Sequence, residues 1–215
     1  MICTTGETHI KFSLIAAEFG SNLFIEKPLS NYIQDTKKLE KIIKRKNIFC
    51  HIGSNMRFHF GPETIKKILS KNILGKIIFC NFWGGMYLPN WHPKEDYKKM
   101  YSAKKSKAGG VILDFIHEID LAYWFFGMPK NVASISNKTG LLKIGTHDVA
   151  DVIMCYKNGV HANIHLDYLQ QPPQRGIRLV GSKGWAEWNL YKKNWRFIFY
   201  LKKPKLLLEK YKYSK

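Results

Sequence analysis

The chain of 215 residues has sixteen glycines but no Gly-x-Gly, the turn whose amides hold pyrophosphate in dinucleotide-binding domains. It has no apolar run of about 18 residues, so the sequence predicts no membrane-spanning helix. Residues 1–20 show no basic-then-apolar leader of the kind that directs secretion. These absences favour a cytoplasmic protein, and the length is sufficient for one or two hydrophobic cores.

Cysteine is scarce, and its spacing is not that of a metal site or a disulfide framework. We expect reduced, mostly buried thiols at the four positions Cys3, Cys50, Cys80 and Cys155. Two histidines, His161 and His165, lie four residues apart in a predicted strand, where they share a face. Ordinary sheet positions explain this pair better than metal ligation does, so no metal site is predicted.

Acidic residues are also few, 16 against 35 basic ones, which gives a net charge of +19. Such a balance can indicate a nucleic-acid or anionic partner. Only five of the basic residues are Arg, the better reader of bases and phosphates. The lysines gather in residues 37–46 and in a tail after Tyr191, where aromatic residues are interleaved. A coding bias toward lysine gives the same mixture, so specific nucleic-acid recognition is not predicted.

Three ionisable residues follow a glycine pair at three-residue steps: Asp114, His117 and Asp120. The apolar residues between them predict one mostly buried helix over residues 109–127, on which residues three apart share a face. Buried ionisable groups are costly unless they are satisfied or used in chemistry. The trio therefore indicates either an acid–base cleft or a core histidine that a carboxylate holds in place.

A second motif is a short apolar strand that ends in Glu26 and Lys27 and is stopped by Pro28. In an open α/β sheet, residues at the ends of buried strands lie where such sheets bind ligands. A solvated Glu–Lys pair before a turn would give the same pattern, so this motif is informative only together with others.

Together the two motifs resemble those of the Gfo/Idh/MocA family of NAD(P)-dependent oxidoreductases, which act on sugars, polyols and nucleotide-linked sugars. The likeness covers roughly residues 1–190 and extends, in order, to segments 4–9, 53–58, 87–97, 101–103, 167–168 and Arg175. Segment 87–103 is similar to a branch that is often associated with surface-polysaccharide sugars.

The resemblance implies an α/β plus α+β fold: the second half of a Rossmann-type doubly wound domain, then a large, mostly antiparallel sheet packed on helices. It predicts a partial dinucleotide-binding domain (1–56), a substrate and oligomerisation domain (57–190) and a lysine-rich tail (191–215). The family's glycine-rich half and closing helical segment have no counterpart, so the chain is expected to be a fragment. A non-catalytic remnant and a sugar- or polyanion-binding module are the alternatives.

The reaction that the resemblance implies is hydride exchange between NAD or NADP and the carbinol carbon of a sugar, polyol or nucleotide-sugar. His117 would be the general acid/base, because the unperturbed pKa of histidine lies near neutrality. Lys27 would hydrogen-bond the reacting oxygen and favour its alkoxide-like charge. Asp114 would orient His117 or grip a neighbouring hydroxyl, although many relatives place the aspartate four residues before the histidine rather than three.

The resemblance also implies two sets of binding residues and a homo-oligomer formed through the open face of the sheet. The nicotinamide side would be lined by Thr4, Thr5, His9, Glu26, Lys27 and Asn55. Aromatic faces suit the C–H surface of a sugar, and Arg and His suit a carboxylate or phosphate. On that basis the substrate-side candidates are Arg57, Tyr87, Trp91, His92, Tyr97, Tyr168 and Arg175.

Local patterns add three expectations that the structure can check. Ser30 is predicted to cap a helix that runs to Lys46, with Ile33 on its apolar side. Residues 87–107 are predicted to form a long, ordered, irregular loop. Turn signals at 157–159 and 181–184 predict hairpins between the strands that flank them.

Overall fold

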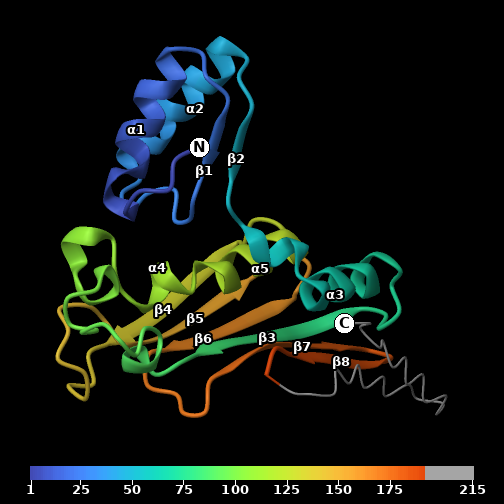
Figure 1. Cartoon of the computed structure of the whole chain (residues 1–215). Coiled ribbons are helices and arrows are strands. Elements are labelled where there is room, and N and C mark those ends of the chain that lie inside the picture. Colours follow the sequence, from blue (N-terminus) through green and yellow to red (C-terminus); the bar gives the residue numbers. More distant parts are fainter. Residues whose placement is uncertain (192–215) are drawn as a thin grey trace, which may run out of the picture.

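The computed structural model describes residues 1–191, which form a small α/β unit followed by a larger α+β unit (Figure 1). In the first unit, strands β1 (Leu23–Ile25) and β2 (Cys50–Ile52) pair in parallel. Ile2 adds a parallel bridge to Ile25, so the first residues of the chain extend this small sheet. Helices α1 (Gly6–Glu18) and α2 (Gln34–Lys46) lie together on one side of the strands.

The second unit is built on a six-stranded sheet of order β4-β5-β6-β3-β7-β8. Its strands are β3 (Ile77–Gly85), β4 (Asn131–Asn137), β5 (Val149–Cys155), β6 (His161–Asp167), β7 (Gln174–Gly181) and β8 (Gly184–Asn189). β3 and β6 run parallel, and all other neighbours in this sheet run antiparallel. The expected large, mostly antiparallel sheet is therefore confirmed.

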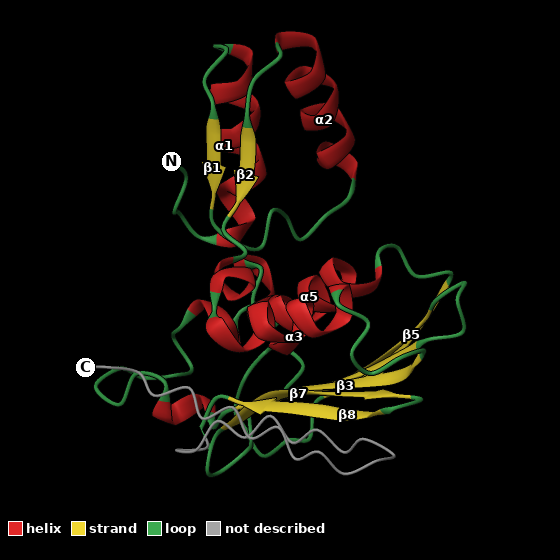
Figure 2. Ribbon diagram, turned by 90° about the vertical axis from the view of Figure 1, so that its right-hand side faces the viewer, coloured by secondary structure: helices red, strands yellow, loops and turns green. Residues whose placement is uncertain are grey.

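Helices cover one face of this sheet and form a middle layer beneath the first unit (Figure 2). They are α3 (Phe60–Ser70), α4 (Val111–Asp114) and α5 (Ile116–Phe126), preceded by the 3-10 turn η1 (Asn55–Phe58). The connection from β3 to α4 contains the short turns η2 (Leu88–Asn90), η3 (Tyr101–Ala103) and η4 (Lys105–Lys107). The predicted irregular loop over residues 87–107 is thus an ordered chain of single turns.

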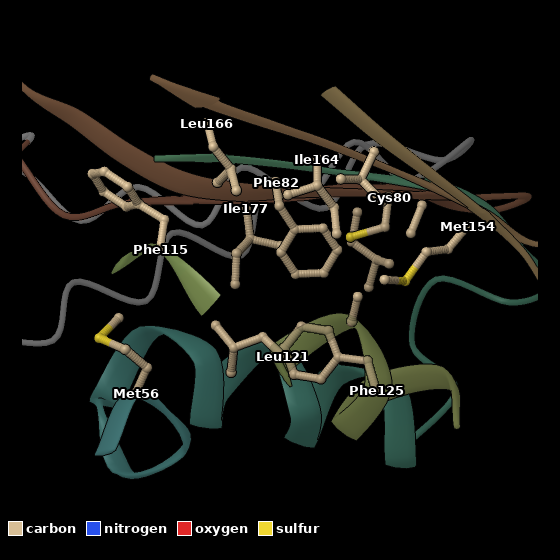
Figure 3. Close-up of a cluster of buried hydrophobic side chains, with 14 of the residues drawn as sticks. Met56, Cys80, Phe82, Phe115, Leu121, Phe125, Met154, Ile164, Leu166 and Ile177 are labelled. Atoms are coloured by element: carbon tan, nitrogen blue, oxygen red, sulfur yellow. The ribbon is translucent and has the colours of Figure 1, made fainter. Parts of the chain in front are cut away.

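Alternation along the strands determines which face is buried. In β6, Ala162, Ile164 and Leu166 point into the core, while the residues between them are exposed. The close-up shows Leu121 and Phe125 of α5 facing Phe82 of the sheet across this core (Figure 3). The rings of Phe82 and Phe125 are 5.9 Å apart. A separate buried cluster, which includes Ile10, Ile25 and Leu39, holds the first unit together.

Most of the predicted elements are present, including both hairpins, β5–β6 and β7–β8. The Ser30 cap is wrong. α2 begins at Gln34, and the Ser30 hydroxyl accepts a hydrogen bond from the Tyr32 amide instead. Ile33 lies outside the helix and is 76% exposed, because the turn that Ser30 makes delays the start of the helix.

The predicted single helix over residues 109–127 is also wrong, since it is two helices that break at Phe115. The Phe115 ring is buried against Trp91, with ring centroids 5.5 Å apart. The Asp114 carboxylate beside it accepts hydrogen bonds from the hydroxyl groups of Ser102 and Tyr168. Tertiary contacts of these two side chains thus accompany a break that helical periodicity did not indicate.

Within residues 1–191, no helix has the length and apolarity that crossing a bilayer requires. The four cysteines are free thiols, as expected. The expectation that they are mostly buried is wrong, because only Cys80 is buried, Cys3 is exposed and the others are intermediate.

Replacing Gly61 in α3 by alanine should destabilise the chain, although alanine normally favours helices over glycine. A Cβ at Gly61 would stand 2.1 Å from the Trp188 indole nitrogen of β8, so the helix or the sheet must shift. We expect a loss of about 1–3 kcal/mol in the free energy of unfolding, measured by urea denaturation. Ser70→Ala at the exposed end of the same helix is the control. Equal stability of both variants would contradict this packing.

Candidate active site

The centre of the site is Lys27, the second residue after β1, whose side chain reaches into the second unit. Its Nζ donates a hydrogen bond of 2.8 Å to the backbone carbonyl of Asp114, the last residue of α4. Burial lowers the pKa of Lys27, and the negative charges of Asp114 and Glu26 partly offset this effect. A partly desolvated ammonium group is thus held between the two units.

The Asp114 carboxylate is 6% exposed and is occupied by hydrogen bonds. Its Oδ2 accepts from the Ser102 hydroxyl at 2.5 Å and from the Tyr168 hydroxyl at 2.7 Å. Burial raises the pKa of Asp114, and the bonds from Ser102 and Tyr168 oppose that rise. Burial, followed by the Asp114 charge, raises the pKa of Tyr101 to about 12 and also raises that of Tyr168.

His117 is three residues after Asp114, near the start of α5, and is 7% exposed. Its Nδ1 is buried and has no hydrogen-bond partner among the described residues. Burial lowers the pKa of His117 to about 3, and the nearby positive charges of Arg175 and Lys27 add to this. The imidazole is therefore neutral at pH 7, and its Nδ1 has an unused hydrogen-bonding capacity within residues 1–191.

Two of the expected substrate residues are arginines that already bind carboxylates of α5. Arg175 makes a two-pronged pair with Glu118, at 2.6 Å and 3.0 Å. Arg57 makes a similar pair with Asp120, at 2.8 Å and 2.6 Å. Asp120 therefore faces Arg57 and does not join Asp114, unlike the shared cleft that the three-residue spacing predicted. The helix break at Phe115 changes the direction of the face that would have held all three.

The aromatic candidates lie around the start of the 87–107 connection. Trp91 packs edge-on against Phe115 and Tyr168, with ring centroids 5.5 Å and 5.6 Å apart. Tyr168 is fully buried, and its hydroxyl is bound to Asp114. Tyr87 and Tyr97 are partly buried, whereas His92 is exposed beside Glu95, 3.9 Å away. The structure thus brings Trp91 and Tyr168 to Asp114 and leaves His92 at the surface.

The candidates for the nicotinamide side follow the carboxyl ends of neighbouring parallel segments, where open α/β sheets bind ligands. The side chains there are Thr4, Thr5, Glu26 and Asn55, all at least partly accessible. His9 differs, because its ring is buried and both nitrogens bond to backbone carbonyls, of Pro28 at 2.7 Å and Thr4 at 2.8 Å. The four accessible side chains offer polar groups of the kind that a nicotinamide amide can bond, whereas His9 is committed to the backbone. No described loop has the glycine pattern that holds a pyrophosphate.

Sequence reasoning did not assign roles to Ser102 and Glu118, which the structure places at the centre of the site. Ser102 stands in segment 101–103, and Glu118 directly follows His117. The only signal in the sequence was their proximity to other motif residues. For metals, no cluster of three or more His, Cys, Asp or Glu within residues 1–191 is arranged to hold an ion.

A small parallel sheet with polar groups at its carboxyl edge is joined to a large sheet, and helix α5 on that sheet supplies a buried histidine. Residues 63–187 match the profile of the GFO/IDH/MocA C-terminal domain. The chain therefore belongs to the Gfo/Idh/MocA oxidoreductase family, and the expected family is confirmed.

Proteins similar to this chain include ones named as oxidoreductases and dehydrogenases. An uncharacterized oxidoreductase of Streptococcus pneumoniae is 27% identical over 201 residues, which are 89% of this chain and 52% of that protein. The myo-inositol 2-dehydrogenase of Lactobacillus plantarum is 25% identical with a TM-score of 0.74, over 86% of this chain and 56% of that one. The chain spans about half the length of the curated relatives it matches.

The fold is also similar to that of the WlbA dehydrogenase of Bordetella pertussis, whose structure contains NADH and UDP-GlcNAcA. The TM-score is 0.82 at 18% identity, over 94% of this chain and 58% of that one. At this identity the likeness concerns the fold alone.

His117→Gln should make the chain less sensitive to acid. In the unfolded chain the pKa of histidine is about 6.5, whereas burial lowers that of His117 to about 3 in the folded chain. The unfolded state therefore binds more protons as the pH falls, and folding loses about 2 kcal/mol from this residue between pH 7 and 5.

Urea unfolding at the two pH values would measure this loss in the wild type, in His117→Gln and in His161→Gln, an exposed histidine of β6. We expect the acid-dependent loss to be smaller by about 2 kcal/mol in His117→Gln alone. The same loss in all three proteins would show that His117 is accessible to protons in the folded state.

Proposed function

We propose that this chain forms the substrate and proton-transfer part of an NAD- or NADP-dependent oxidoreductase, which exchanges a hydride with a sugar, polyol or nucleotide-sugar hydroxyl. One observation carries the proposal. Lys27 of the first unit lies near enough to His117 of the second for its charge to lower the pKa of His117, and a buried nitrogen of His117 has no partner among the described residues. A positioned cation and a neutral imidazole are the two groups that oxidation of a carbinol requires.

Each residue has a distinct part in the proposed step. The neutral His117 accepts the proton of the carbinol hydroxyl as the C–H hydride leaves, and returns it in the reverse reaction. The Lys27 ammonium donates a hydrogen bond to the carbinol oxygen and favours its developing negative charge. A bound nicotinamide ring would supply the hydride acceptor. Thr4, Thr5, Glu26 and Asn55 would line its side of the site, and groups outside this sequence would hold its pyrophosphate.

The substrate class is supported by the aromatic surroundings and by the names of similar proteins. Trp91 offers a partly buried ring beside Phe115, a surface suited to the C–H face of a sugar. Relatives include a 2,7-anhydro-N-acetylneuraminate hydratase of Mediterraneibacter gnavus and a myo-inositol 2-dehydrogenase of Thermotoga maritima. A role in surface-polysaccharide biosynthesis, in the cytoplasm, belongs to the same proposal.

We place the boundary between cofactor and substrate domains at residues 56 and 57. Two buried clusters support this division, one with members such as Ile10 and Leu39 and one with Ile65 and Leu121. The open face of the six-stranded sheet, where Ile153 is 46% exposed, would contact a second copy. The predicted tail lies, apart from Tyr191, outside the described residues.

Lys27→Ala and His117→Ala should each reduce turnover about 100-fold or more in the protein completed with a glycine-rich nucleotide-binding half. The first change removes the cation at the carbinol oxygen, and the second removes the proton acceptor. Turnover would be measured by NADH or NADPH absorbance over a panel of sugars, inositols and nucleotide-sugars. Lys44→Ala, an exposed lysine of α2, is the control. Near-normal rates in both site variants would rule out the proposed chemistry.

The second candidate is a non-catalytic remnant, and exposed apolar side chains on the first unit favour it. Phe19 is 85% exposed and Phe49 is 67% exposed, the latter beside His51. If nothing covers this surface in the protein, the chain should bind a dye for exposed apolar patches and should associate in solution. Phe19→Ser with Phe49→Ser should then lower dye fluorescence, with Tyr32→Ser as the exposed control. A monodisperse wild-type chain that binds no dye would count against a remnant.

A further inference from the structure

We propose that Ser102 and Tyr168 are positioning residues for Lys27, and that they act through Asp114. The inference rests on the proposed function, because it concerns how the lysine of that site is held. It changes the expected roles of two residues. Asp114 would hold the site together rather than orient His117 or grip a neighbouring hydroxyl, and Tyr168 would support Asp114 rather than touch substrate.

The geometry of Asp114 carries this inference. Its carbonyl oxygen accepts the Lys27 ammonium at 2.8 Å, and its Oδ2 accepts two hydroxyl groups at 2.5 Å and 2.7 Å. The backbone and the side chain of one residue thus bind three other segments: the end of β1, the turn η3 and the end of β6. Since α4 stops at Asp114, the helix alone does not fix the position of this carbonyl.

The partners of Asp114 are themselves held. Tyr168 is fully buried, and its amide donates to the Asp148 carbonyl at 2.8 Å. Ser102 is fully buried, and its carbonyl accepts the Thr146 hydroxyl at 2.8 Å. A buried network in which each group has a partner is rigid, because any movement leaves a desolvated polar group unsatisfied. The Asp114 carbonyl is consequently fixed, and Lys27 with it.

The same hydrogen bonds argue against direct binding of substrate by the Asp114 carboxylate. Its Oδ2 already accepts two hydrogen bonds, and the residue is only 6% exposed. The Tyr168 ring is enclosed by Trp91 and Phe115, and its hydroxyl is directed at Asp114. Both donors come from within the chain, so Oδ2 is already bonded before any substrate arrives.

The mobility of the Lys27 side chain tests the proposal without any need for catalysis. In the chain with ¹³C-labelled lysine side chains, the order parameter of the Lys27 Cε should report a rigid group in the wild type. In Ser102→Ala and in Tyr168→Phe it should fall, and in the double variant it should reach the flexible range below about 0.6. Both substitutions remove a single hydroxyl group, so the packing volume is nearly conserved.

Two controls in the same chain distinguish a loss of order at Lys27 from increased mobility of the whole second unit. Tyr156→Phe removes a buried tyrosine hydroxyl of the second unit whose partner is the Met154 sulfur, and should leave Lys27 rigid. Lys66 donates to the Trp124 carbonyl at 2.6 Å, so it is also a lysine bound to a backbone oxygen. Its order parameter should stay unchanged in every variant.

An unchanged Lys27 in the double variant, with Lys66 also unchanged, would overturn the proposal. Loss of order at both lysines in one single variant would indicate unfolding, and the other single variant would then decide. In the completed enzyme the two substitutions should lower kcat about tenfold and leave KM within about twofold. Absence of turnover in the wild type would refute the proposed function and leave the NMR result standing.

Discussion

Because moving an ammonium group out of water costs several kcal/mol, Lys27 can occupy its partly buried position only where a fixed acceptor compensates it. The acceptor is the Asp114 carbonyl, from a different unit of the fold. The small sheet, the break between α4 and α5, and the buried Ser102–Asp114–Tyr168 network are all needed to bring these two atoms together. The site is therefore a property of the joined units and of neither alone.

The arginine charges of both units cancel in pairs with carboxylates. All four described arginines form ion pairs: Arg45 with Glu18, Arg57 with Asp120, Arg175 with Glu118, and Arg178 with Glu187. Lys27 instead has a neutral carbonyl partner, so its positive charge remains available to a ligand. Burial lowers the pKa of His117, and the charges of Arg175 and Lys27 lower it further, so the imidazole stays neutral. Lys27 and His117 are thus a cation and a neutral base at the junction of the two units.

Patterns that depend on short-range chemistry were readable from the sequence. β1 after Asn22, the β5–β6 hairpin at Asn158-Gly159 and the motif residues Lys27 and His117 follow from apolar runs and turn residues. The helix break at Phe115 was not readable, because it accompanies contacts with Trp91 and Tyr168, which are distant in sequence. For the same reason the partners of Arg57 and Arg175 could not be assigned, since a sequence pattern does not show which carboxylate a guanidinium will meet.

The ion pairs also limit how a substrate can be recognised. Removing one partner of a buried pair costs about 3–5 kcal/mol, because the other charge is left desolvated. Glu118 is 2% exposed, so a substrate anion that drew Arg175 away would have to compensate a cost of this kind before it gained any affinity. Recognition is physically easier through groups that are not held in ion pairs, namely the His117 imidazole and the Lys27 ammonium, whose described partner is a neutral carbonyl. On this reasoning Arg175 shapes the field around His117 and holds α5 to the sheet, and the substrate meets the surface that this pair supports.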